Sequence, residues 1–597
     1  MDRTSHMLDN NRHAPFFDLE DTRSFVANHW AIELSVDKLD SLLPSWLVPR
    51  YTLNQQQVWL KADLISAREV IKHSLDEVPN SELFGGQSEN SFSTRCSKID
   101  VGADREQLST GFFAACSNLL RSHCDSKEAR SVDLEQTHTY IGMSRVAAST
   151  PLLLALVERQ KTTFARLSRS AASQFANSAY YMGSKKLLAP FLVEALFSVA
   201  DEHTQVVDLM CGSGAAAGAF SQFWPTYASD SQVFCQRLAQ VQGGGFSRAR
   251  AAKLLERISD PVRSNTQQLL LSVSELVEQE DSIFHGEFGP ETLASYKRFC
   301  ESIPLFPDRG QIGLWNPTVV VNERRQLPRD LPYCLCTAYF ANIYFGFRQA
   351  IEIDSIRFAI DQLESLLDRE WALGALVTTM SAVALSYAGH FAQPILKSAS
   401  DISENNLSRI LERRAMSVMH EFSIRLLNLA EESERAKFQI LPVVGPWKHA
   451  LTQLNNMSKK TTIVYLDAPY KREEYSRYYH VLETICTYRY PSSSGAARIP
   501  DKRAGERFRS EFFTRSTPQM VDAFVNVIGS VLERNCICAW SYSDNGAIDP
   551  AQVVEIVSKK YGNRLQSFGT PYSHKAQGGS LQKHITEYLI LFIPPNL

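Results

Sequence analysis

An acidic residue followed by a glycine-rich turn forms the first segment of the chain that could bind a ligand. Asp208 stands in the apolar run 206–209, and Gly212 and Gly214 follow it. Such a turn lets backbone N–H groups approach a ligand and begins a helix, although many turns of this kind only pack tightly. Asp230 comes 22 residues after Asp208, a distance at which an acid accepts hydrogen bonds from ribose hydroxyls. Because the third glycine of the dinucleotide fingerprint is missing, the turn favours an adenosine-containing cofactor without a pyrophosphate.

A second segment could act on an amino group attached to a flat ring. The apolar residues 463–466 precede Asp467, Ala468, Pro469 and Tyr470. The amino nitrogen of adenine is a poor nucleophile because its lone pair is delocalised into the ring. A carboxylate and a backbone carbonyl that accept its hydrogens can stabilise the charge that develops there, and an aromatic ring can stack on the base. An ordinary turn at the end of a strand is the alternative interpretation.

The elements around these segments predict an interrupted α/β sheet. A strand at 205–209, a helix at 215–223 and a strand that ends at Asp230 form one half of a doubly wound sheet. The pattern resumes at Thr461. Further strands are expected at 462–466, 535–541 and 586–593, and further helices at 187–199, 517–533 and 550–559. Between the two halves the sequence predicts mostly helices, at 250–258, 263–279, 339–364, 371–387 and 406–434.

Length and composition limit the class of protein. At 597 residues the chain is too long for one hydrophobic core, so two to four domains are expected. A net charge of −3 means that any contact with nucleic acid must rest on local basic patches. The 11 cysteines show neither zinc spacing nor a compact disulfide framework, which favours reduced thiols and a cytoplasmic location without a bound metal. The uncharged residues 371–396 predict a buried helix followed by a loop and not a membrane span.

Three motifs, taken in order, resemble those of the Dam-like class of N6-adenine DNA methyltransferases. They are Tyr-x-Gly-Ser-Lys at 181–185, Asp-x-x-Cys-Gly-Ser-Gly at 208–214 and Asp-x-Pro-Tyr at 467–470. The resemblance covers residues 180–597 and matches the helical middle only in patches. It implies a Rossmann-like α/β sheet that uses S-adenosylmethionine (SAM), with a large helical insertion and an extra N-terminal domain.

The resemblance implies four regions and a set of site residues. Residues 1–169 are an N-terminal domain of unassigned role, 170–240 the SAM-binding half, 241–455 the helical insertion with target recognition, and 456–597 the catalytic half. The residues implied to bind the cofactor are Tyr181, Lys185, Asp208, Gly212, Gly214, Asp230 and Asp467. Those implied to be catalytic are Asp467, Pro469 and Tyr470. The family usually has a proline where this chain has Ala468, which leaves the catalytic turn less rigid.

The segment after the catalytic turn has the composition of a nucleic-acid contact. Residues 470–516 contain ten Lys or Arg against six Asp or Glu, with aromatic residues among them. Basic groups bind phosphates, and aromatic rings stack on exposed bases. The alternative is a solvated loop whose aromatic rings pack on the sheet. The densest basic run, and the predicted DNA-binding set, is Lys502, Arg503, Arg507, Arg509 and Arg515.

The expected function is therefore transfer of a methyl group from SAM to the N6 amino group of adenine in DNA. A restriction-modification or phage-defence system is the expected setting, with DNA and possible partner proteins of such a system as partners and no membrane contact. Two alternatives stay open. One is methylation of adenine in RNA, and the other is a non-catalytic DNA-binding module that keeps the methyltransferase fold.

Overall fold

The computed structural model describes residues 181, 183–285, 290–307, 310–387, 389–394, 402–454, 461–469, 474–575 and 582–597, together with three short strands nearer the N-terminus. Those strands are β1 (Phe16–Phe17), β2 (Tyr51–Leu53) and β3 (Gln56–Leu60), which pair antiparallel in the order β1-β3-β2. The rest of the predicted N-terminal domain, 1–169, lies outside the described residues.

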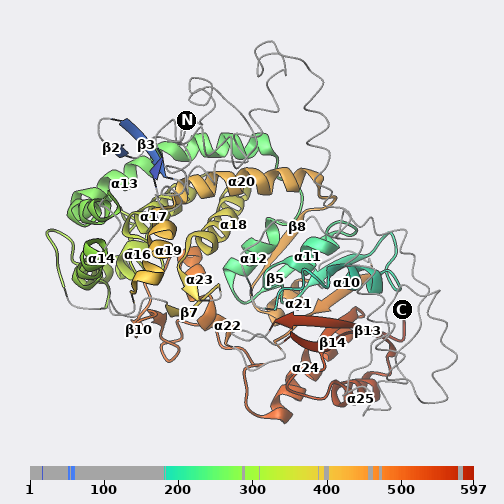
Figure 1. The fold of residues 1–597 in the computed structure, drawn as a ribbon. Coiled ribbons are helices and arrows are strands. Elements are labelled where there is room, and N and C mark those ends of the chain that lie inside the picture. The colour runs from blue at the N-terminus through green and yellow to red at the C-terminus, as the bar shows by residue number, and fades with distance from the viewer. Residues whose placement is uncertain are drawn as a thin grey trace, which may run out of the picture.

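A seven-stranded, mostly parallel sheet forms the centre of the α/β part (Figure 1). β14 runs antiparallel to both β12 and β13, and every other pair of neighbours is parallel. A single reversed strand near one edge is compatible with the Rossmann-like methyltransferase sheet that the sequence predicts. In sheet order the strands are β13 (Arg564–Lys575), β14 (Gln582–Ile593), β12 (Ile537–Ser543), β9 (Thr462–Leu466), β4 (Gln205–Asp208), β5 (Thr226–Asp230) and β8 (Ile440–Val444).

Helices cover both faces of this sheet, because alternate strand residues point to opposite sides. Val206 packs in the cluster that contains α10 and α11, whereas Val207 packs in the cluster that contains α21, α24 and α25. The first face carries α10 (Ala189–Leu196), α11 (Ala215–Phe220) and α12 (Val233–Gln240). The second face carries α21 (Trp447–Leu454), α24 (Thr517–Leu532) and α25 (Pro550–Tyr561).

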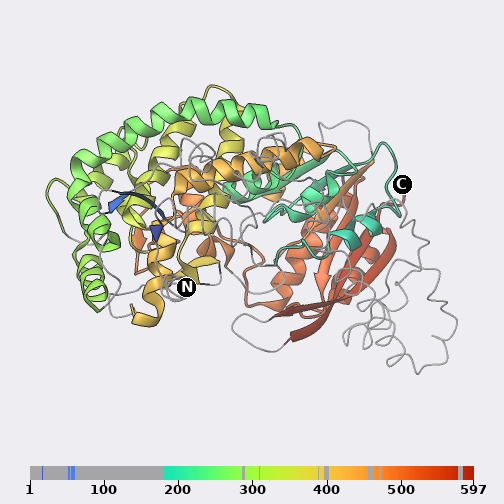
Figure 2. The same ribbon diagram turned by 45° about the horizontal axis from the view of Figure 1, so that its top comes forward.

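Between α12 and β8 the chain forms a large group of helices beside the sheet, which Figures 1 and 2 show from two directions. The group packs on the sheet through α12, which contacts α18. Its members are α13 (Arg248–His285), α14 (Pro290–Ser302), α15 (Pro317–Gln326), α16 (Leu335–Tyr339), α17 (Phe347–Asp361), α18 (Leu366–Val383), α19 (Glu404–Ala415) and α20 (Val418–Arg435). A short hairpin of β6 (Ser386–Tyr387) and β7 (His390–Pro394) follows α18.

The segment between β9 and α24 returns from the sheet to the helical group. It contains α22 (Tyr475–Tyr478), α23 (His480–Thr487), β10 (Ser493–Ser494) and β11 (Ile499–Pro500). Arg357 of α17 donates hydrogen bonds to the carbonyls of Ile485 and Cys486, which fixes α23 against the helices. Among the described helices, none combines the length and apolar composition needed to cross a membrane.

The strands and helices predicted near the two motifs are confirmed, and two strands of the seven-stranded sheet were not predicted. β8 lies inside the range 241–455, where the sequence suggested helices, and it pairs with β5. β13 pairs with β14 along its whole length. The helices expected at 250–258 and 263–279 are one helix, α13, which continues through Pro261.

Gly214 connects β4 to α11 and brings α12 close to this connection. It is the N-cap of α11 and has a left-handed φ of +76°. A Cβ added there would lie 2.3 Å from the Cα of Ala239 in α12, so the backbone itself blocks a side chain. Gly562, the C-cap of α25, has a similar φ of +63° but open space around it.

We predict that Gly214→Ala destabilises the protein by about 2–5 kcal/mol, because it adds a steric clash to the left-handed strain. Gly562→Ala carries the strain alone and should cost about 1–2 kcal/mol. Denaturant unfolding of the two variants measures the difference. Equal losses would show that α12 moves away from Gly214 at no cost.

Candidate functional site

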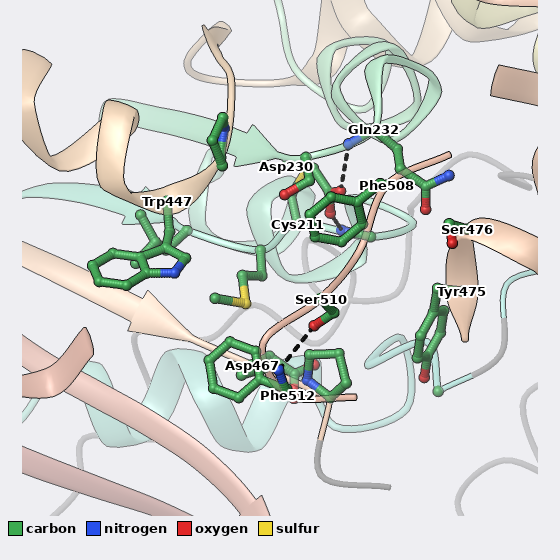
Figure 3. Close-up of a pocket in the computed structure, with 18 of the residues that line it drawn as sticks. Cys211, Asp230, Gln232, Trp447, Asp467, Tyr475, Ser476, Phe508, Ser510 and Phe512 are labelled. Atoms are coloured by element: carbon green, nitrogen blue, oxygen red, sulfur yellow. Dashed lines mark hydrogen bonds between the residues drawn. The ribbon is translucent and has the colours of Figure 1, made fainter. Parts of the chain in front are cut away.

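A cavity of about 490 Å³ lies at the carboxyl ends of β4, β5 and β9. Figure 3 shows Asp230, Cys211 and Gln232 at one end of it and Asp467 with Phe512 at the other. Ligands of open α/β sheets bind in the crevice beyond the carboxyl ends of the strands. The position of the cavity is therefore one at which this fold binds small molecules.

The parallel register of three strands brings three carboxylates to this edge. Asp208 lies opposite Tyr465 of β9 and Ala228 of β5. Asp467 and Asp230 follow those two partners by two residues, so all three acids face the same cavity. Residues far apart in sequence therefore meet because the strands are adjacent and unidirectional.

Asp208 is a buried carboxylate with one oxygen that has no partner. Its Oδ2 accepts a hydrogen bond from the backbone N–H of Ala217 at 3.1 Å, while its Oδ1 accepts none. The residue is 1% exposed. Burial raises the pKa of Asp208 well above its usual range, and the charges of Asp467 and Asp230 raise it further. A cationic group bound in the cavity would offset this cost.

Asp230 fixes the glycine-rich turn against the start of α12. Its Oδ2 accepts from the N–H of Gly212 at 3.1 Å, and its Oδ1 accepts from the N–H of Gln232 at 3.0 Å. Burial raises the pKa of Asp230, although these hydrogen bonds act in the opposite direction. A carboxylate can accept about four hydrogen bonds, so both oxygens keep capacity for a ligand.

Lys185 lies between two carboxylates at the other end of the cavity. Its Nζ is 3.3 Å from Asp467 Oδ1 and 3.3 Å from Glu587 Oε2. Burial raises the pKa of Asp467 to about 6, a shift that Lys185 opposes and Glu587 strengthens. Asp467 is still 18% exposed, so its carboxylate is accessible from the cavity.

Tyr181 provides a flat aromatic surface beside the glycine-rich turn. Its ring stacks on Tyr479 with centroids 4.7 Å apart and on Tyr475 at 5.6 Å. A Cβ at Gly212 would lie 2.8 Å from the Cε1 of Tyr181. Gly212, with a φ of +49°, is therefore needed both for the turn and for the position of this ring.

Six further aromatic residues line the cavity and were not predicted as site residues, and Trp447, Phe508 and Phe512 are among them. Trp447 begins α21, shortly after β8, and Phe508 and Phe512 come from the basic segment that follows the turn at Asp467. Figure 3 shows Phe508, Ser510 and Phe512 of this segment in the wall of the cavity. The mixture of aromatic and basic residues at 470–516 was the available sequence signal for Phe508 and Phe512. Trp447 was not predicted as a site residue because β8, the strand that leads to it, was not predicted.

The structure brings most of the predicted site residues together. Those that line the cavity are Tyr181, Lys185, Asp208, Gly212, Asp230, Asp467 and Pro469, joined by Lys502 and Arg509 from the predicted DNA-binding set. Arg503 and Arg507 line an adjoining pocket instead. Gly214 packs against α12 and is not part of the cavity wall, and Arg515 lines neither space. Tyr470 lies outside the described residues.

Comparison with known proteins finds a distant similarity to a curated protein. No family model matches the chain. The chain is 21% identical over 414 residues to "Modification methylase StsI" of Streptococcus sanguinis, an alignment that covers 69% of this chain and 51% of that protein. The chain thus spans about half the length of this curated relative.

We predict that Asp208→Asn stabilises the ligand-free protein by on the order of 1 kcal/mol at pH 8. The folded pKa of Asp208 is raised, so its ionised form opposes folding, and the gain should shrink at pH 5. Thermal unfolding at both pH values measures this, with the exposed Asp522→Asn of α24 as the control. A loss of stability that is equal at both pH values would contradict the prediction.

Proposed function

We propose that the chain is a SAM-dependent methyltransferase that acts on the N6 amino group of adenine in DNA. The observation that carries the proposal is the single cavity that joins the unpartnered carboxylate oxygen of Asp208 to the turn Asp467-Ala468-Pro469. The name of the relative, a modification methylase, supports methyl transfer. A modification role beside a restriction or defence partner stays a prediction.

The residues of the cavity fit SAM chemically. Asp208 Oδ1 is a buried acceptor without a donor, as the ammonium of the methionine part requires. Asp230 stands at the end of β5, where ribose hydroxyls can donate to it, and Tyr181 is a flat surface near the turn. SAM, when bound, supplies a methyl group on a positively charged sulfonium, and the acids around the cavity suit that charge.

Asp467 is the residue proposed to act on the amino group of the base. Its carboxylate lines the cavity and can accept a hydrogen bond from the N6 amino group, which stabilises the positive charge that grows on the nitrogen. The carbonyl of Ala468 is the proposed second acceptor. Ala468 is fully buried, so packing gives the turn some of the rigidity that a proline would supply.

Aromatic side chains form the proposed binding site of the base. An adenine amino group is inaccessible inside a duplex, so the base has to leave the stack. Phe512 is 2% exposed and Trp447 9% exposed, and both line the cavity. Rings held in this way provide stacking surfaces that are already in position. Tyr470, proposed from the resemblance, would add to them.

The first test incubates the protein with methyl-labelled SAM and bacterial genomic DNA, followed by analysis of the nucleosides. We expect label in N6-methyladenine. Label in cytosine, or in adenine of RNA offered in parallel, would overturn the proposed base or substrate. Binding of SAM in calorimetry without any transfer would favour the non-catalytic module.

We predict that Asp467→Ala lowers turnover roughly 10²–10³-fold and leaves SAM affinity much less affected, since one preorganised acceptor is lost. Wild-type activity should fall as the pH drops below about 6, where Asp467 gains a proton and can no longer accept from the amino group. Turnover and SAM calorimetry of the variant measure the first effect, and the pH profile of kcat/KM of the wild type measures the second. A profile that is flat down to pH 5 would exclude Asp467 as the acceptor.

We predict that Lys185→Met moves the acidic limb of the pH profile, where activity falls as Asp467 gains a proton, to higher pH. Lys185 holds down the pKa of Asp467, so its removal leaves burial and Glu587 to raise the pKa further. Lys186→Met is the matched control, because this neighbouring lysine is exposed and lies outside the cavity. An unshifted limb in a folded Lys185→Met variant would assign the titration to another group.

A further inference from the structure

A second pocket, of about 540 Å³, adjoins the cavity and is rich in positive charge. It is named here the basic pocket. Two acids, Glu474 and Asp501, face the five cations in its wall. The cations are Arg477, Lys502, Arg503, Arg507 and Arg509.

Three segments that follow the catalytic turn build the basic pocket. Glu474 is the N-cap residue of α22, and Arg477 lies within that short helix. The β10–β11 hairpin contributes Ser494, Ile499 and Pro500. The loop after β11 contributes the remaining cations. The pocket is therefore a folded structure and not a chance gathering of surface side chains.

Glu474 joins two of these cations. Lys502 Nζ donates to its Oε1 at 2.6 Å, and Arg507 Nη1 lies 3.3 Å from its Oε2. Arg507 is 12% exposed and Glu474 19% exposed. Burial opposes ionisation of Glu474, but the hydrogen bond from Lys502 and the charge of Arg507 outweigh it and lower its pKa. A firmly ionised carboxylate thus occupies one side of a strongly cationic pocket.

The basic pocket and the cavity share part of their walls. Glu474, Lys502 and Arg509 line both spaces. A nucleotide whose base enters the cavity carries its backbone phosphates directly beside that base. The shared wall is consequently where such a phosphate arrives, and arginine binds phosphate oxygens with paired hydrogen bonds.

We propose that the basic pocket binds the backbone phosphodiester next to the nucleotide whose base enters the cavity, and that Glu474 is an internal competitor that holds Lys502 and Arg507 until this phosphate replaces it. The identity of the base rests on the proposed function. The phosphodiester chemistry does not, because DNA and RNA share it.

The proposal makes opposite predictions for the two members of the ion pair. Removing the competitor in Glu474→Gln should raise affinity for nucleic acid roughly 3–10-fold. Removing a ligand of the phosphate in Arg507→Gln should lower affinity and reduce the salt slope of binding by about one. The gain from Glu474→Gln should shrink when Arg507→Gln is also present, because the two residues act through one contact.

The experiment measures fluorescence anisotropy of a labelled DNA duplex of mixed sequence, and of a labelled single-stranded RNA, over a series of salt concentrations. Glu555→Gln and Lys559→Gln are matched controls that change the same charges on exposed positions of α25. Circular dichroism and thermal unfolding verify that each variant is folded.

The outcomes separate this proposal from the proposed function. If DNA is methylated but Glu474→Gln and Arg507→Gln behave like their controls, the basic pocket is not the phosphate site. The same holds if Glu474→Gln weakens binding, or if the wild type binds neither nucleic acid. If nucleic acid binds without methyl transfer, the proposed function fails, and opposite shifts in the two variants still support the phosphate site.

Discussion

The organising constraint of this molecule is the repulsion among carboxylates gathered at one sheet edge. The parallel register of β5, β4 and β9 places Asp230, Asp208 and Asp467 at the same end of the sheet. Only Lys185 forms ion pairs with this group among the described residues, and it is shared with Glu587. The fold thus holds mutually repelling carboxylates in the wall of the cavity, and a positively charged ligand bound there would reduce this repulsion.

The sequence predicts the centre of the sheet better than its edges. β4, β9 and β12 are fully buried and contain apolar residues at their centres, and β5 lies between β4 and β8. β8 and β13 are the two edge strands, and each contains a proline, Pro442 and Pro571 respectively. An edge strand tolerates a missing N–H donor and a mixed pattern of side chains, so local pattern is a weak guide to it.

The same distinction applies to the site. Residues within a local motif, such as Asp208 with Gly212 or Asp467 with Pro469, can be identified from spacing. Gly214 belongs to its motif, yet its conformation serves packing against α12. Trp447, Phe512 and Glu474 reach the site by folding of separate segments, and no spacing relates them to the motifs. Their roles depend on tertiary contacts that the one-dimensional pattern does not contain.

The interleaved order of the strands also shapes how the chain folds during synthesis. β5 ends at Asp230, but its partner β8 begins only at Ile440, and the partner of β4 on its other side, β9, at Thr462. At ordinary rates of translation, β4 and β5 wait on the order of ten seconds or more for these neighbours. Throughout that interval the outer edges of β4 and β5 have no partner strand on the ribosome. If the helices between β5 and β8 fold early, they bring β8 close to the open edge of β5. This shortens the time during which that edge is available for aggregation.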